Sequence, residues 1–182
     1  PTGVLEFFTE GEPPIVFTAG TPKAHCRDFF QTSVEACRLL ICRGALLTRF
    51  ADQVPVRLPD GVRHFDYVPF SQILPRSAAF VHHAGIGTLA QALRAGIPQL
   101  SVPIALDLPD NAAILQRLGV GLTLRPRAYQ PAAAARAIQE LLNSPAIQER
   151  CRSIAGRFRD GDSVDATCQA IEEVANGQRG DG

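Results

Sequence analysis

Short apolar runs alternate along this chain with longer segments in which apolar residues recur at helical spacing. The apolar runs, interpreted as strands, cover residues 13–22, 44–50, 62–68, 78–83, 98–103 and 119–124. The other segments, interpreted as helices, cover residues 24–42, 71–74, 86–95, 110–118, 131–142, 145–158 and 163–175. This order favours parallel strands joined by crossover helices. The sequence therefore predicts the α/β class, as a Rossmann-like, three-layer α/β/α domain with a parallel sheet of about six strands.

Length and charge narrow the possible functions. The chain has 182 residues and a formal net charge of zero, which fits one domain and does not favour a nucleic-acid-binding protein. No apolar run reaches the roughly 18 residues that a transmembrane helix needs. The chain begins with proline and contains no methionine, so we expect it to be a piece of a longer protein.

Ligands of such sheets bind outside the carboxyl ends of the strands, where the strand order reverses. The polar and glycine-containing turns fall at these ends, at residues 18–21, 67–70, 82–88 and 103–111. We therefore expect the functional site to be built from these four turns.

The stretch "FVHHAGIGTLAQALRAGIP" (80–98) places two histidines and two glycines between a strand and a helix. A helix N-terminus exposes backbone N–H groups that attract anions. Thr88, and either His82 or His83, could add hydrogen bonds to a phosphate. The alternative is a tight turn with one exposed and one buried histidine. The stretch has neither a Gly-Lys-Ser/Thr sequence nor GxGxxG spacing, which disfavours kinases and dinucleotide enzymes.

Two acidic and two aromatic residues lie at or beyond the ends of other predicted strands. Asp107 could accept hydrogen bonds from vicinal sugar hydroxyls, or it could be a solvated loop carboxylate. Asp110 is interpreted as a helix cap. Tyr67 and Phe70 could stack on a nucleobase or belong to the core.

Residues 80–121 resemble the donor-site signature of the nucleotide-diphosphate-sugar glycosyltransferases, enzymes with two Rossmann-like domains (the GT-B architecture). "PPIVFTAGT" (13–21) resembles the first strand and loop of their C-terminal domain, and "YVPFSQILPRSAAFVHH" (67–83) resembles the segment that leads into the signature. "GIGTLAQAL" (85–93) is most similar to the bacterial rhamnosyltransferases that act on 3-hydroxyacyl lipids, within the UDP-glycosyltransferase superfamily. The resemblance covers nearly the whole chain.

The resemblance implies a division of the chain and a role for each matched residue. Residues 13–175 would form the nucleotide-sugar donor-binding domain, between an interdomain linker remnant at 1–12 and a disordered tail or tag remnant at 176–182. The diphosphate would be bound by His82, Gly85, Gly87 and Thr88. The nucleoside would be held by Thr18, Thr21, Tyr67, Val68 and Phe70. The sugar would contact Asp107 and Leu108.

The sequence departs from the family pattern at three positions. Ala84 stands where many relatives have glycine, and we expect its φ to be negative because a methyl group disfavours positive φ. Leu108 replaces a common glutamine, which would suit a 6-deoxy sugar such as rhamnose. Ala90 replaces a glutamate that binds ribose in plant relatives, which would suit a deoxyribose donor such as dTDP, or Gln91 could substitute.

The implied activity is that of an inverting, metal-independent glycosyltransferase that moves a hexose, with rhamnose one candidate, from a dTDP- or UDP-sugar to a lipid or small-molecule hydroxyl. No cofactor and no metal ligand are expected. The general base would lie on a missing N-terminal acceptor domain, so the isolated domain would be inactive. No nucleic-acid partner is expected, and the location would be cytoplasmic, with peripheral attachment to the inner membrane face. Two alternatives stay open: a sugar-nucleotide epimerase, and a catalytically silent partner subunit.

Overall fold

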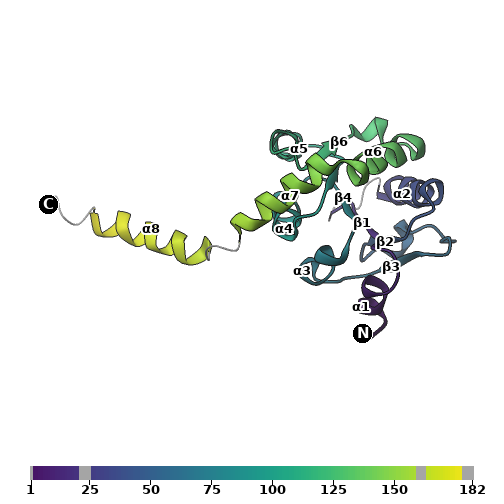
Figure 1. The fold of residues 1–182 in the computed structure, drawn as a ribbon, viewed down its shortest axis with the longest axis horizontal. Helices are drawn as coiled ribbons and strands as arrows, with labels where there is room; N and C mark the ends of the chain where they lie inside the picture. The colour runs from purple at the N-terminus through teal and green to yellow at the C-terminus, as the bar shows by residue number, and fades with distance from the viewer. Residues whose placement is uncertain (1, 21–25, 159–162, 178–182) are drawn as a thin grey trace.

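The computed structural model describes residues 2–20, 26–158 and 163–177. Its centre is a six-stranded sheet with the order β3-β2-β1-β4-β5-β6, in which all neighbouring strands are parallel (Figure 1). The strands are β1 (Ile15–Thr18), β2 (Gly44–Leu47), β3 (Val62–Phe65), β4 (Ala79–His82), β5 (Gln99–Ser101) and β6 (Gly121–Thr123). The predicted α/β class and parallel sheet are confirmed.

Helices follow the strands as the sequence predicts, with short 3-10 turns between them. The helices are α1 (Thr2–Thr9), α2 (Cys26–Leu40), α3 (Phe70–Ile73), α4 (Ile86–Ala95), α5 (Leu108–Arg117), α6 (Pro131–Asn143), α7 (Pro145–Arg157) and α8 (Ser163–Gly177). The 3-10 turns are η1 (Ala51–Gln53), η2 (Leu74–Arg76) and η3 (Pro126–Ala128). None of the helices in the described ranges combines the length and apolar character that crossing a membrane requires.

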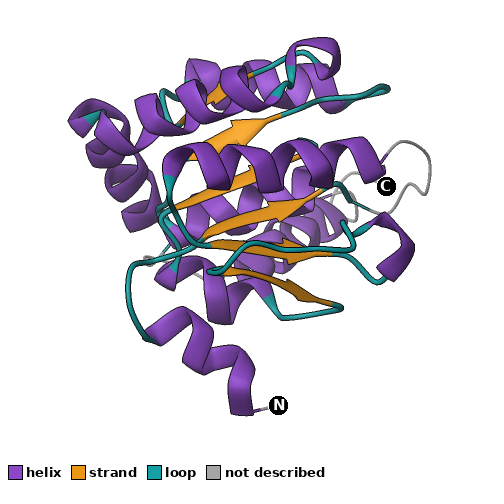
Figure 2. Cartoon of the chain, turned by 90° about the vertical axis from the view of Figure 1, so that its right-hand side faces the viewer, coloured by secondary structure: helices purple, strands orange, loops and turns teal. Residues whose placement is uncertain are grey.

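The sheet is covered by helices on both faces (Figure 2). Successive strand residues point to opposite faces, and Phe17 packs in a cluster with residues of α2 and α6, whereas its neighbour Val16 packs in a cluster that includes Phe8 of α1 and Ala92 of α4. Burying one such large side chain contributes about 1.5–3 kcal/mol. Burial of both faces explains why the strands are continuous apolar runs rather than alternating ones.

Two helices differ from the expectation. No helix was predicted before the first strand, but α1 buries Phe7 and Phe8, whose rings lie 5.5 and 5.9 Å from that of Phe65. α5 begins at Leu108 rather than Asp110, and its N-cap is Asp107. The assignment of Asp110 as the cap was therefore wrong, because Asp110 already lies in the first helical turn.

The strand order reverses between β1 and β4. The chain passes from β1 to β2 and β3 on one side, then returns to β4 on the other side. β1 and β4 are in register, with Thr18 opposite His82. The turns that follow these two residues therefore lie side by side at the carboxyl edge of the sheet, which is where ligands of such folds bind.

Candidate functional site

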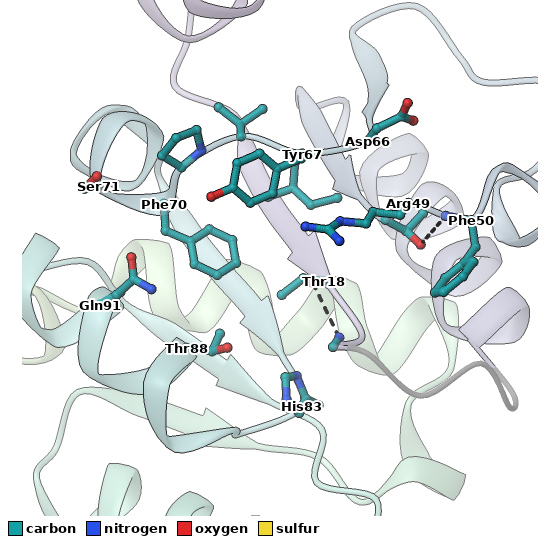
Figure 3. A pocket seen from close by; sticks show the side chains of 15 residues that line it. Thr18, Arg49, Phe50, Asp66, Tyr67, Phe70, Ser71, His83, Thr88 and Gln91 are labelled. Atoms are coloured by element: carbon teal, nitrogen blue, oxygen red, sulfur yellow. Dashed lines mark hydrogen bonds between the residues drawn. The ribbon is translucent and has the colours of Figure 1, made fainter.

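A cavity of about 710 Å³ opens at this edge of the sheet (Figure 3). Its walls come from the turns after β1, β2 and β3 and from the first turns of α4. Seven residues that the sequence had singled out line it, namely Thr18, Tyr67, Val68, Phe70, His83, Thr88 and Gln91. Three of the four turns expected to form the site therefore meet in one cavity.

The start of α4 forms one wall of this cavity. Gly85 is the N-cap residue and provides no side-chain cap, and the first backbone bond of the helix runs from Leu89 N–H to the Gly85 carbonyl over 2.9 Å. The N–H groups of residues 86–88 therefore have no acceptor within the helix. Together with the helix dipole and the Thr88 side chain, they make this wall suited to an anion.

The turn before α4 contains an alanine in an unusual conformation. Ala84 has φ +71°, in the left-handed region, so the expectation of a negative φ was wrong. An L-residue other than glycine pays roughly 1–2 kcal/mol there. Its N–H donates a hydrogen bond of 3.0 Å to Nδ1 of His82. This bond holds the turn in its strained shape.

His82 does not reach the cavity, contrary to its expected role at the diphosphate. Its side chain is 0% exposed, its Nε2–H donates to Oε1 of Gln99 over 2.9 Å, and its Nδ1 accepts the Ala84 bond. Burial lowers the pKa of the imidazole to about 3. Because β4 is a central strand, its last residue is enclosed on both sides, and His82 is a neutral, structural histidine.

His83, one residue further on, is the histidine that lines the cavity. A Cβ on Gly20 would lie 2.6 Å from its ring, and one on Gly85 would lie 2.5 Å from it. The two glycines therefore leave the space that the imidazole occupies. Nδ1 of His83 is buried without a hydrogen-bond partner among the described residues. Burial lowers the pKa of this imidazole, and the charge of Asp107 opposes that effect.

The opposite wall of the cavity is aromatic and follows β3. The Tyr67 side chain is 69% exposed, whereas Val68 is buried beside it. Phe70 packs edge-on against Phe80 of β4, with ring centroids 5.1 Å apart. Thr18 accepts a long hydrogen bond of 3.4 Å from the Gly20 N–H. Tyr67 therefore exposes its ring at the cavity, while Phe70 also belongs to the core.

Besides His82, four predicted site residues do not line this cavity. Gly85 is the N-cap of α4 and Gly87 lies in its first turn, so both shape the start of the helix that carries Thr88. Asp107 and Leu108 lie at the start of α5, where Nδ2 of Asn111 donates to the Asp107 carboxylate over 2.9 Å. Asp107 therefore occupies a helix N-cap position, which was not expected from the sequence. Thr21 lies outside the described residues.

A second cavity, of about 660 Å³, lies on the other side of His83. Apolar residues form much of its wall, including Ala19, Phe29, Val102, Ile104 and Pro131. Its polar residues include Asp28, Gln31 and Arg127. His83 lines both cavities, so a ligand that extends past its ring could enter either one.

Comparison with known proteins places this geometry in a family. The profile of the family described as "Erythromycin biosynthesis protein CIII-like, C-terminal domain" matches residues 47–171. The chain belongs to this EryCIII-like family. The match includes the turn after β4, the Tyr67 wall and the start of α5.

Several relatives of this EryCIII-like domain are named as glycosyltransferases. The O-mycaminosyltylonolide 6-deoxyallosyltransferase of Streptomyces fradiae is 32% identical over 178 residues, which cover 93% of this chain and 40% of the relative. The aclacinomycin-T 2-deoxy-L-fucose transferase of Streptomyces galilaeus is 40% identical over 101 residues, which cover 54% of this chain and 23% of the relative. The chain thus spans about 40% of the first of these proteins.

Solved structures support the same fold. The glycosyltransferase VinC, solved in complex with dTDP, superposes on the EryCIII-like domain with a TM-score of 0.79 and 26% identity, covering 94% of this chain and 44% of VinC. The forosaminyltransferase SpnP superposes with a TM-score of 0.81 at 22% identity, covering 93% of this chain and 46% of SpnP. The predicted membership of the GT-B glycosyltransferases is confirmed, and the narrower likeness to rhamnosyltransferases stays a prediction.

Two charged residues of the EryCIII-like site, Arg49 and Asp66, were missed in reasoning from the sequence. Arg49 lines the first cavity, two residues beyond the end of β2. Ligands of such sheets bind outside the carboxyl ends of the strands, and this principle applies to the end of β2 as it does to the other strand ends. The Asp160-Gly161-Asp162 triplet, which has Asp-x-Asp spacing, lies outside the described residues. Within the described residues, no group of three or more His, Cys, Asp or Glu side chains is arranged to hold a metal ion.

Proposed function

We propose that this domain binds a nucleoside-diphosphate sugar in the first cavity, as the donor half of a glycosyltransferase. The observation that carries the proposal is the position of His83. Its ring lines the cavity at the strand-order reversal, its Nδ1 is unpartnered among the described residues, and the uncapped start of α4 contributes to the same cavity. An imidazole and several free N–H groups on one wall suit a diphosphate.

Each wall of the cavity would hold one part of the donor. The diphosphate would lie between His83 and the N–H groups of residues 86–88, with the Thr88 hydroxyl as a further donor. The base would stack on the exposed face of Tyr67, with Val68 backbone groups at its edge. Thr18 would lie between these two regions. His83 thus takes the role that was expected of His82.

The sugar would extend from the diphosphate past His83 toward the second cavity and Asp107. The apolar wall of that cavity suits a sugar with few hydroxyl groups, and Leu108 offers no side-chain hydrogen bond to one. Relatives named for 6-deoxyallose and 2-deoxy-L-fucose fit this reasoning. We propose a deoxyhexose, of which rhamnose is one example, carried on dTDP or UDP.

The reaction of the complete protein would be an inverting transfer. The acceptor oxygen, of a lipid or small-molecule hydroxyl, would form a bond to the anomeric carbon as the bond from that carbon to the β-phosphate oxygen breaks. Negative charge then grows on the departing nucleoside diphosphate. The His83 imidazole and the helix N–H groups stabilise that charge more in the transition state than in the ground state. The proton of the acceptor would go to a base outside these 182 residues.

Titration calorimetry on this chain with dTDP and with UDP tests the proposal. We expect one of the two to bind, and His83→Ala to weaken its binding about tenfold or more, because it removes a charge-assisted hydrogen bond. His83→Gln retains a hydrogen-bond donor, so its nucleotide affinity should fall less than that of His83→Ala. Absence of binding by either nucleotide would contradict the proposal and favour the silent partner subunit. Sugar-nucleotide isomerisation by the complete protein without an acceptor would favour the epimerase.

A further inference from the structure

Arg49 projects into the first cavity from a firmly held loop. Its neighbour Thr48 donates from Oγ1 to Oε1 of Gln53 over 3.1 Å and accepts at the same atom from the Phe50 N–H over 3.2 Å. The Thr48 carbonyl lies 2.8 Å from Nε2 of His64, on β3. The backbone on both sides of Arg49 is therefore fixed, and only the arginine side chain has freedom to move.

The guanidinium group lies over the ring of Tyr67. Its central carbon is 5.5 Å from the ring centroid, and Figure 3 shows the side chain extending toward that ring and into the space between the cavity walls. Among the described residues, no carboxylate forms an ion pair with it within 4.0 Å, and the nearby Asp66 carboxylate lies 3.5 Å from Nε2 of His64. Arg49 is therefore a cation in the cavity that no carboxylate neutralises, beside the aromatic face.

We propose that Arg49 contacts the nucleobase of the donor and closes the base-binding part of the cavity from the side opposite Tyr67. This inference rests on the proposed function. A guanidinium is planar, stacks on π faces and can donate two parallel hydrogen bonds to carbonyl oxygens. A pyrimidine base offers both a π face and carbonyl oxygens. The base would lie between the Tyr67 ring and the guanidinium plane.

The observed spacing requires a small movement on binding. Stacked layers are about 3.5–4.0 Å apart, so a base between the two groups needs roughly 7–8 Å. The present separation is 5.5 Å. Arg49 is exposed, and its side chain can swing outward by about 2 Å while the loop stays in place. In the free protein the guanidinium therefore occupies the position where the base would bind. On binding, the guanidinium would move outward and cover the face of the base opposite Tyr67.

A phosphate contact is the competing role for a cation in this cavity, and three variants separate the two. Arg49→Ala removes the group, and Arg49→Lys keeps the charge but loses the planar fork. Arg63→Ala is a matched control, because Arg63 is also exposed and lies 5.1 Å over an aromatic ring, that of Phe7, away from the cavity. Binding of dTDP is measured by calorimetry, and binding of inorganic pyrophosphate by competition.

We expect Arg49→Ala to weaken dTDP binding about two- to thirtyfold, the range of a cation–π contact. Arg49→Lys should recover little of this loss, and pyrophosphate binding should change in neither variant. Arg63→Ala should behave as the parent chain. Equal losses for dTDP and pyrophosphate, with rescue by lysine, would overturn the proposal in favour of a phosphate contact. Unchanged dTDP binding in Arg49→Ala would overturn it outright, whereas a parent chain that binds neither dTDP nor UDP refutes the proposed function and this inference with it.

Discussion

His82 and Ala84 are joined by a hydrogen bond of 3.0 Å from the alanine N–H to Nδ1 of the buried imidazole. The other ring nitrogen donates to Gln99 on β5. His82 thus ties the left-handed turn at Ala84 to the neighbouring strand. Because His83 lies inside that turn, the buried His82 fixes the position of the half-buried His83 without touching the cavity.

Replacing His82 should cost stability. His82→Leu leaves the Gln99 side chain and the Ala84 N–H buried without partners, and each lost partner costs about 1–3 kcal/mol. We expect the free energy of unfolding in urea to fall by roughly 2–4 kcal/mol. The double variant His82→Leu/Gln99→Leu removes both side-chain partners and should recover part of the loss. A double variant no more stable than His82→Leu would contradict the stabilising role assigned to the hydrogen bond between His82 and Gln99.

Stability should decrease in mild acid because of the same residue. Burial lowers the pKa of the His82 imidazole to about 3 in the folded chain, whereas an unfolded histidine titrates near about 6.5. Above about pH 6.5 both states are neutral. As pH falls from about 6.5 toward 3, only the unfolded chain binds the proton, so the free energy of unfolding should fall by about 1 kcal/mol per pH unit.

Urea unfolding at several pH values between about 7 and 4, compared between the parent chain and His82→Leu/Gln99→Leu, checks this expectation. Other groups titrate in both proteins, so the difference in slope isolates His82. The double variant should show the shallower slope. Equal slopes would mean that His82 is accessible to protons in the folded chain.

Gly85→Ala should displace His83 without straining the backbone. Gly85 has φ −61°, which alanine adopts readily, but its Cβ would lie 2.5 Å from Nε2 of His83. We expect weaker dTDP binding by calorimetry with little change in melting temperature. Gly156→Ala is the control, since a Cβ there meets nothing within 4 Å. It should retain dTDP binding and gain up to about 1 kcal/mol of stability from helix propensity. Full dTDP binding by Gly85→Ala would show that the ring position is unimportant.

Ala84→Gly should be tolerated or stabilising. Its φ of +71° disfavours a methyl group, and relief of that strain is worth roughly 1–2 kcal/mol, partly offset by the greater freedom of glycine in the unfolded chain. Ala113→Gly, at an exposed position within α5, should instead cost about 1 kcal/mol. Thermal unfolding of the two variants measures this difference in stability. An equal loss of stability in both variants would indicate that Ala84 is not strained.

The order of strands and helices could be predicted because the periodic signals are strong and local. The α4 segment was predicted at its observed bounds, and Gly96 ends the helix in the left-handed conformation. α1 was missed because it is short and is held by packing of its two phenylalanines on Phe65 rather than by helix propensity. The start of α5 was placed late, although Pro109 fits the first turn of a helix and could have shown it.

The histidine pair shows the limit of sequence reasoning at the site. The composition of the turn after β4 predicted an anion-binding wall, and the structure provides a cavity there. Which histidine reaches it depends on whether the strand ends at residue 82 or 83, and strand ends are not fixed by periodicity to one residue. Because β4 ends at His82, between β1 and β5, that ring is enclosed and His83 is the first side chain outside the sheet.

The most direct test of the phosphate-binding role of His83 is NMR titration of the two imidazoles with and without dTDP. Burial lowers the pKa of the His83 imidazole in the free chain, and a bound diphosphate should raise it, because a nearby anion favours the charged form. The account predicts an upward shift of the His83 pKa on binding, while the buried His82 stays neutral throughout. Binding of dTDP that leaves the His83 resonances and pKa unchanged would contradict it.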